Sequence, residues 1–225
     1  MALLHGAAVA RAEEVGWATS QAAELTRQGE ARALAGQADV ALSRYLEALR
    51  FDATYGPAYL GLGALYERAG DPREAERTYS VGLDHVRGFV EGYRARAALR
   101  ARAGRRAEAL ADLEAAVALR GDDAALLQEL AAAYVAASAL PAALGVTRRL
   151  AALAARTGDG ALVARATTQA RALSALIDEA DPVRAGGRDR GPVRRAIARY
   201  AASPAAARTR GGAPAGRAPR EPVRP

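Results

Sequence analysis

Few side chains in this sequence belong to the types that catalyse reactions, because it has two histidines and no cysteine. His5 and His85 lie far apart in the sequence, so a metal site formed by these two histidines is not expected. Gly61 and Gly63 resemble the start of a phosphate loop, but no third glycine follows at the required spacing. The adjacent carboxylates of residues 122–123 fit a helix cap better than acid–base catalysis. The sequence therefore predicts a protein without enzymatic activity, metal or cofactor.

Charge is distributed unevenly along the chain. Arginine is the only strongly basic residue type, and the net charge is +7. Residues 183–225 contain eleven arginines and two carboxylates, whereas the rest of the chain is nearly neutral. Exclusive use of arginine is typical of a bacterial protein encoded by a GC-rich genome. The basic character therefore belongs to the C-terminal segment alone.

The C-terminal segment, residues 182–225, is rich in Arg, Pro, Gly and Ala, and we expect it to be largely disordered. Its candidate phosphate-binding cluster consists of Arg184, Arg188, Arg190, Arg194, Arg195 and Arg199. Such a cluster binds nucleic acid or an anionic surface with a strong salt dependence. A solvated tail without a binding role is the competing interpretation. A binding tail implies that the rest of the chain is a spacer or oligomerisation unit, and truncation of the chain at Asp181 separates this function from one carried by residues 1–181.

Between residues 57 and 86 the sequence predicts a helix, a tight turn and a second helix. Apolar and small residues recur three, four and seven apart, which places them on one face of each helix. These are Tyr59, Leu62, Gly63 and Tyr66, then Ala75, Tyr79, Gly82 and Leu83. Gly70 can end the first helix in the left-handed conformation. Asp71 can cap the second, with Glu74 completing a capping box.

The same unit recurs every 34 residues. Gly36, Gly70 and Gly104 hold one place in successive units, and Ser138 holds it in the next. Gly29 pairs with Gly63 at this interval, and Tyr45 pairs with Tyr79. In the third unit, however, Arg96 and Arg100 replace the seam residues Leu62 and Tyr66. A period of 34 residues with this pattern resembles the tetratricopeptide repeat family.

The resemblance implies an all-α fold, a right-handed solenoid of antiparallel helix pairs. The expected divisions are an N-terminal helical segment at 1–21, four repeats at about 22–55, 56–89, 90–123 and 124–157, and a capping helix within 158–181. An array needs such a cap because its end unit otherwise exposes an apolar face. We expect Trp17 to pack against the first unit.

The resemblance also implies that the first helices of the units line a concave groove, which binds a peptide or helix of another protein. The candidate groove residues are Leu60, Ala64, Glu67, Arg68, Glu91, Arg94, Ala98, Arg102 and Gln128, and the first unit adds Thr26, Glu30 and Ala33. Small residues leave room for a partner backbone. Arg68, Arg94 and Arg102 can donate charge-assisted hydrogen bonds to a carboxylate or carbonyl. The alternative is that these are ordinary solvated positions.

The predicted function is thus a non-catalytic adaptor or scaffold. The absence of lysine argues against the acidic chaperone tails that some family members clamp. Self-association through uncovered end units is a further alternative. No apolar run approaches the roughly 20 residues of a membrane span. The N-terminus is ambiguous, because it has no charged stretch and its apolar run is too short for a signal peptide, yet residues 8–13 resemble the small-residue end of one. We therefore expect a cytoplasmic protein, or a periplasmic one if the start codon is assigned too late.

Overall fold

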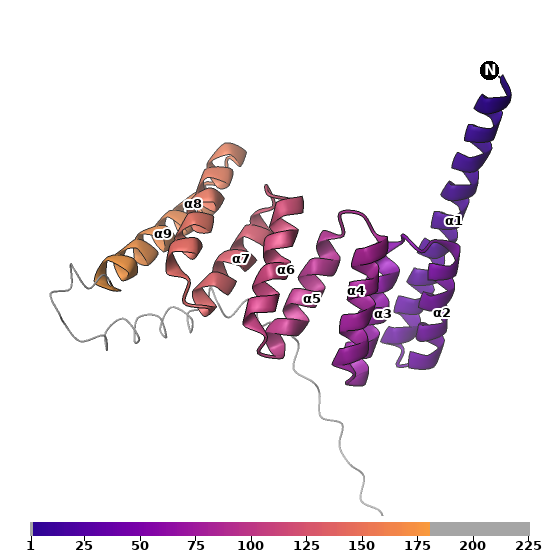
Figure 1. The fold of residues 1–225 in the computed structure, drawn as a ribbon, viewed down its shortest axis with the longest axis horizontal. Helices are drawn as coiled ribbons and strands as arrows, with labels where there is room; N and C mark the ends of the chain where they lie inside the picture. The colour runs from indigo at the N-terminus through magenta and orange to yellow at the C-terminus, as the bar shows by residue number, and fades with distance from the viewer. Residues whose placement is uncertain (1, 181–225) are drawn as a thin grey trace, which may run out of the picture.

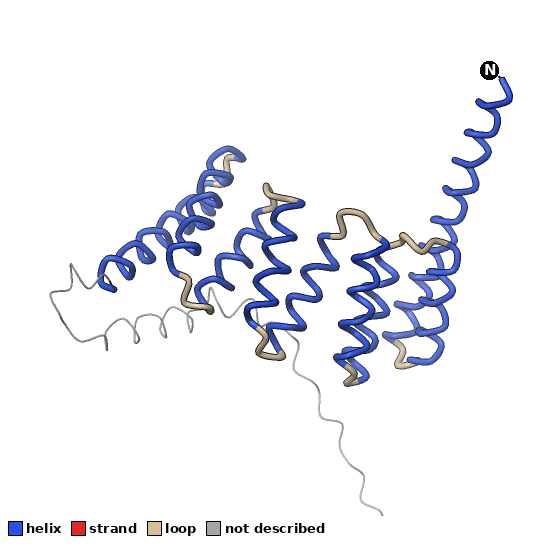
Figure 2. Tube along the Cα trace, in the orientation of Figure 1, coloured by secondary structure: helices blue, strands red, loops and turns tan. Residues whose placement is uncertain are grey.

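The computed structural model describes the backbone of residues 2–180 and the side chains of residues 16–180. This part of the chain folds into helices connected by short turns, without a strand (Figures 1 and 2). The helices are α1 (Ala2–Leu34), α2 (Ala38–Phe51), α3 (Gly56–Ala69), α4 (Pro72–His85), α5 (Val90–Arg102), α6 (Arg106–Leu119), α7 (Ala124–Ala136), α8 (Leu140–Thr157) and α9 (Gly160–Ala180). The expected disorder of the C-terminal segment concerns residues outside the described range.

Successive helices pack side by side and form an elongated row from α1 to α9 (Figure 1). The helix pairs are α1/α2, α3/α4, α5/α6 and α7/α8. The first helices of neighbouring pairs also meet, since α1 contacts α3 and α3 contacts α5. The predicted all-α solenoid of helix pairs is therefore confirmed. The N-terminal part of α1 extends beyond the row (Figure 1), and α1 runs unbroken through the expected division at residue 22.

The turn inside each pair contains a residue in the left-handed conformation, as the 34-residue spacing predicts. The φ angles are 75° at Gly36, 82° at Gly70 and 79° at Gly104, and Ser138 follows with 60°. A glycine adopts this conformation without the steric cost that a Cβ atom imposes. The turns therefore repeat because the same backbone requirement returns at the same interval.

The predicted capping box at the start of α4 forms only in part. The side chain of Asp71 accepts a hydrogen bond from the Glu74 N–H at 3.2 Å, as expected for an N-cap. The Asp71 N–H donates instead to the Tyr66 carbonyl oxygen at 3.0 Å. It is therefore already occupied and does not bond to the Glu74 carboxylate, which faces Arg77.

A tyrosine packed on a glycine joins the two helices of each of the first two pairs. A Cβ atom on Gly63 would lie 2.2 Å from Cε1 of Tyr79, and one on Gly29 would lie 2.8 Å from Cε1 of Tyr45. Both distances are shorter than any Cβ contact tolerates, so the ring occupies the space of the missing side chain. The expected close approach of the paired helices at these glycines is confirmed.

The two ends of the described array differ in how they are covered. At the C-terminal end, α9 buries Leu162, Ala166 and Leu173, which confirms a capping helix. At the N-terminal end, Trp17 contacts Phe51 edge to face with ring centroids 5.5 Å apart, yet 59% of Trp17 remains exposed. Trp17 thus packs against the first pair on one side only. None of the helices between residues 2 and 180 combines the length and apolar character that a membrane span requires.

Candidate partner-binding groove

The nine predicted groove residues lie on the first helices of the second, third and fourth pairs. Leu60, Ala64, Glu67 and Arg68 are on α3, while α5 contributes Glu91, Arg94, Ala98 and Arg102, and α7 contributes Gln128. All nine are half-buried or exposed. Thr26 of α1 does not belong with them. It is 2% exposed, and its hydroxyl donates to the Ala22 carbonyl oxygen at 2.7 Å, so it is part of the core.

Two of the three predicted carboxylate-binding arginines have acidic partners within the array. Arg94 of α5 donates two hydrogen bonds to Glu129 of α7, one of them from Nε at 3.0 Å. Arg102 of α5 donates to Glu67 of α3. The hydrogen bond to Glu129 raises the pKa of Arg94. These arginines therefore join successive first helices rather than facing a partner with unused donors.

The sequence contained a signal for these two ion pairs that the groove prediction did not use. Each pair joins residues 35 apart, which is one repeat plus one residue. An acid and a base at that interval occupy neighbouring first helices at nearly the same height. Glu129 lies on the predicted groove face of α7, but its pairing with Arg94 was not predicted. A third contact on this face joins Glu91 to Arg120 at 3.0 Å.

A hollow of about 590 Å³ opens between α1 and α3 and is called the α1–α3 hollow below. Four predicted residues of α3 line it, namely Leu60, Ala64, Glu67 and Arg68, and so does the predicted Glu30 of α1. Leu34, Tyr45 and Gly61 complete the lining and were not predicted. The predicted residues of α5 and α7 lie outside it.

Gly61 explains why the hollow reaches the ring of Tyr45. A Cβ atom at position 61 would lie 2.4 Å from Cε1 of that ring, so only glycine admits the contact. Burial of the ring, followed by the negative charge of Glu30, raises the pKa of the Tyr45 hydroxyl, while Arg68 acts in the opposite direction. Leu34 is 83% exposed at the edge. The hollow thus combines an apolar rim with one hydroxyl, two carboxylates (Glu30 and Glu67) and one guanidinium (Arg68).

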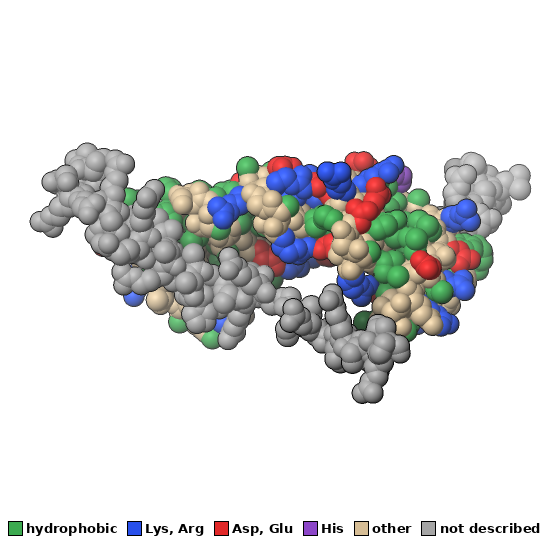
Figure 3. Space-filling model, turned by 90° about the horizontal axis from the view of Figure 1, so that it is seen from below, with side chains coloured by type: hydrophobic (Ala, Val, Ile, Leu, Met, Phe, Trp, Pro, Cys, Tyr) green, Lys and Arg blue, Asp and Glu red, His purple; other side chains and the backbone are tan. Residues whose placement is uncertain are grey.

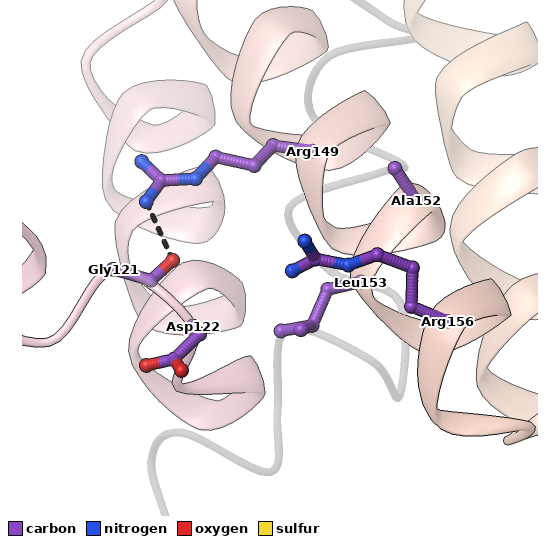
Figure 4. Close-up of a pocket in the computed structure, with 6 residues that line it drawn as sticks. All are labelled: Gly121, Asp122, Arg149, Ala152, Leu153 and Arg156. Carbon is purple, nitrogen blue, oxygen red and sulfur yellow. Dashed lines mark hydrogen bonds between the residues drawn. The ribbon is translucent and has the colours of Figure 1, made fainter.

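A second hollow, of about 370 Å³, lies between the α6–α7 turn and α8 (Figure 4). Gly121, Asp122, Arg149, Ala152, Leu153 and Arg156 line it. Arg149 extends across it and donates to the Gly121 carbonyl oxygen at 2.6 Å. Because α8 is the second helix of its pair, this hollow is separate from the predicted groove.

The described surface carries acidic and basic side chains interspersed with apolar ones, as the face in Figure 3 shows. Within the described residues, no group of three or more His, Asp or Glu side chains is placed to hold a metal ion. The six arginines of the predicted phosphate-binding cluster, Arg184 to Arg199, lie outside the described range.

Comparison with solved structures finds proteins of the same architecture at low sequence identity. A crystal structure of MamA protein matches 81% of this chain and 92% of its own, with 16% identity and a TM-score of 0.52. YrrB, described as a TPR protein with an unusual peptide-binding site, matches 66% of this chain and 84% of its own (16% identity, TM-score 0.47). The first TPR of Spaghetti (RPAP3), bound to an HSP90 peptide, matches 53% of this chain and 95% of its own (21% identity, TM-score 0.46).

The fold is that of the tetratricopeptide repeat. At these identities the likeness concerns the fold alone. No protein-family model matches the chain, and no curated protein is significantly similar to it in sequence. Any function of this tetratricopeptide array must therefore be argued from its own residues.

Proposed function

We propose that the chain is a non-catalytic adaptor, in which the face formed by α1, α3, α5 and α7 binds a peptide or helix of another protein. The α1–α3 hollow is the observation that carries the proposal. Small residues at its floor, Gly61 and Ala64, leave room for a partner backbone or side chain, and exposed Leu34 offers an apolar contact. A concave site with an apolar lining and a few polar groups is typical of ligand binding.

The ion pairs between successive first helices support this function by preorganising the surface. Glu67–Arg102 joins α3 to α5, and Arg94–Glu129 joins α5 to α7. Partly exposed pairs of this kind contribute little to stability individually. They do, however, hold the helices at fixed relative positions before the partner arrives. A preformed surface lowers the ordering cost of association, so a partner needs fewer contacts to bind.

Peptide-display selection against the full-length chain tests the proposal. Ala64→Arg places a long side chain in the hollow, and Ala118→Arg makes the same change at an exposed position of α6. We expect selected peptides to bind Ala64→Arg at least about tenfold more weakly than wild type, which corresponds to about 1.4 kcal/mol. Ala118→Arg should retain wild-type affinity. Equal binding by both variants, with unchanged circular dichroism, would exclude the groove.

A further inference from the structure

Three side chains on successive helices meet at one carboxylate in the middle of the array. The hydroxyl of Tyr79, on α4, donates to Oε1 of Glu67 at 2.8 Å, and the guanidinium of Arg102, on α5, donates to Oε2. Tyr79 is 2% exposed, so Glu67 is the acceptor that makes the burial of its hydroxyl tolerable. The arrangement is a tyrosine and an arginine that share one carboxylate.

The same arrangement recurs one repeat earlier without its carboxylate. Thirty-four residues before Tyr79 and Arg102 stand Tyr45 and Arg68, but the place of Glu67 is taken by Ala33. Tyr45 packs on Gly29 as Tyr79 packs on Gly63. Ala33 lies in the cluster that surrounds Tyr45. Both donors are therefore kept one repeat earlier, Tyr45 on α2 and Arg68 on α3, and only the acceptor is missing.

Neither donor has an alternative partner in the described part of the chain. Tyr45 is 1% exposed, and its hydroxyl makes no hydrogen bond with any described residue. Arg68 forms no ion pair or hydrogen bond there either, although it is close enough to influence Tyr45 electrostatically. Tyr45 and Arg68 both line the α1–α3 hollow. No fully buried polar side-chain atom of the described residues lacks a hydrogen-bond partner, so the Tyr45 hydroxyl is open to the hollow rather than enclosed in the core. A hydroxyl that has no partner within the described chain and opens into a hollow beside a cation indicates a site for an acceptor that arrives from outside.

We propose that the α1–α3 hollow takes an Asp or Glu side chain of a partner segment, whose carboxylate accepts hydrogen bonds from Tyr45 and Arg68. The place it fills, between Tyr45, Ala33 and Arg68, is called the carboxylate slot below. This inference rests on the proposed function and adds the chemistry of the ligand. The partner supplies in trans the group that Glu67 supplies within the chain for Tyr79 and Arg102.

Two acidic residues beside the slot shape its specificity. Glu67 is held by Tyr79 and Arg102, whereas Glu30 lines the hollow without a hydrogen-bond partner in the described residues. Glu30 disfavours a polyacidic segment and favours one in which a basic residue follows the acid. We therefore expect Glu30→Gln to relax this preference without removing binding. Complete loss of binding in Glu30→Gln would instead mean that Glu30, and not Tyr45 with Arg68, is the main contact of the partner, which would overturn the proposal.

The slot can first be tested within the chain by Ala33→Glu, with Ala33→Gln as the matched control. Because Ala33 occupies the place of Glu67, the new carboxylate should bond to Tyr45 and Arg68. We expect Ala33→Glu to unfold at least about 2 °C above Ala33→Gln in thermal denaturation. The gain should vanish when Tyr45→Phe is added. Equal midpoints for the Glu and Gln variants would overturn the slot.

Binding in trans is tested with two blocked hexapeptides, one with a central Glu-Arg pair and one with Gln-Arg, added to the full-length chain. The amide NMR signal of Gly61 reports occupancy of the hollow. We expect the Glu-Arg peptide to bind about tenfold more tightly, because charged hydrogen bonds are stronger than neutral ones. Tyr45→Phe and Arg68→Gln should each abolish the difference, and Ala33→Glu should abolish binding. Arg77→Gln, at an exposed arginine of α4, is the control that should change nothing.

The other outcomes of the peptide experiment would each count against the carboxylate slot. Equal binding of the two peptides, or no binding of the Glu-Arg peptide at about 10 mM, would overturn the proposal. Display-selected peptides that are sensitive to Ala64→Arg but not to Tyr45→Phe would leave the proposed function standing and remove only the carboxylate slot. A shift of the Gly61 signal with protein concentration, in the absence of peptide, would show that a second copy of the chain fills the slot. That result would overturn the proposal of a segment from another protein.

Discussion

Arg96 of α5 donates two hydrogen bonds to Asp112 of α6, from Nε at 3.1 Å and from Nη2 at 2.7 Å. Arg100 donates to the same carboxylate at 2.8 Å, and the Asp112 side chain is only 4% exposed. At the corresponding positions of the second unit, the seam contains Leu62 and Tyr66. The third pair is therefore joined by a buried ionic cluster where its neighbour has an apolar contact.

This cluster predicts a large loss of stability in Asp112→Asn. Removal of the charge leaves two guanidinium groups, each about one-sixth exposed, without their shared partner. Breaking a buried pair from one side costs about 3 kcal/mol or more. Urea denaturation should therefore show a free energy of unfolding lower by about that amount.

The control for Asp112→Asn is Glu47→Gln, which breaks the ion pair with Arg44 on the surface of α2. Both side chains of that pair are more than 40% exposed, so the change should cost no more than about 0.5 kcal/mol. Similar losses in the two variants would mean that the buried cluster contributes no more than a solvated pair.

Glu76 makes the stability of the folded state depend on pH in the acid range. Hydrogen bonding from Arg105, aided by Arg100 and opposed by burial, lowers the pKa of Glu76 below its usual 4.5. The folded state therefore binds fewer protons than the unfolded state in this range, so stability rises with pH. The contribution is present above pH 4.5 and is lost as pH falls through the lower folded-state value.

The measurement for Glu76 is the urea midpoint of wild type and Glu76→Gln between pH 7 and about pH 3. The glutamine variant should be less stable at neutral pH, and its midpoint should fall less steeply on acidification. The two curves should approach each other as pH falls, because protonation of the wild-type carboxyl removes the charge that glutamine lacks. Parallel curves across the range would show that Glu76 is not responsible.

The hydroxyl of Tyr134 should lose its proton only at unusually high pH because of Glu114. Their hydrogen bond, with smaller effects of burial and charge, raises the pKa of Tyr134 to about 12. Glu114→Ala removes both the acceptor and the negative charge, so the pKa should fall towards 10. Absorbance at the phenolate band during an alkaline titration measures it, and Tyr134→Phe identifies the component that belongs to this residue. An unchanged titration in Glu114→Ala would contradict the assigned cause.

Two glycine-to-alanine changes should act in opposite directions. At Gly63 the new Cβ would lie 2.2 Å from the ring of Tyr79, which is itself buried, so we expect a loss of about 1–3 kcal/mol. At Gly145, inside α8, nothing lies within 4 Å of the new Cβ. Alanine there should stabilise the helix by about 0.5–1 kcal/mol. Thermal denaturation of both variants checks the contrast, and a loss at both sites would point to a general intolerance of helix substitutions.

The helices and turns of the described chain could be predicted from the sequence because their determinants are local. Apolar spacing of three and four residues defines a helix face wherever it occurs. The left-handed residue at the end of a helix needs only its own backbone freedom, which is why Gly36, Gly70 and Gly104 marked the turns correctly. The 34-residue spacing also showed that Gly63 and Tyr79 recur as Gly29 and Tyr45, but the packing of each ring on its glycine was seen only in the structure.

The pairing of the groove arginines was not predicted and was seen only in the tertiary structure, although the 35-residue spacing of the pairs is present in the sequence. Arg94 and Arg102 carry the same charge on the same helix, and a helical pattern does not state which acid on a neighbouring helix each one reaches. Thr26 looked like a surface position, but the crossing of α1 with its neighbours buries it. The sequence shows that Tyr45, Ala33 and Arg68 stand 34 residues before Tyr79, Glu67 and Arg102. That Tyr45 and Arg68 line an open hollow depends on how closely α1 and α3 pack, because interhelical distance is set by the side chains between the helices rather than by periodicity.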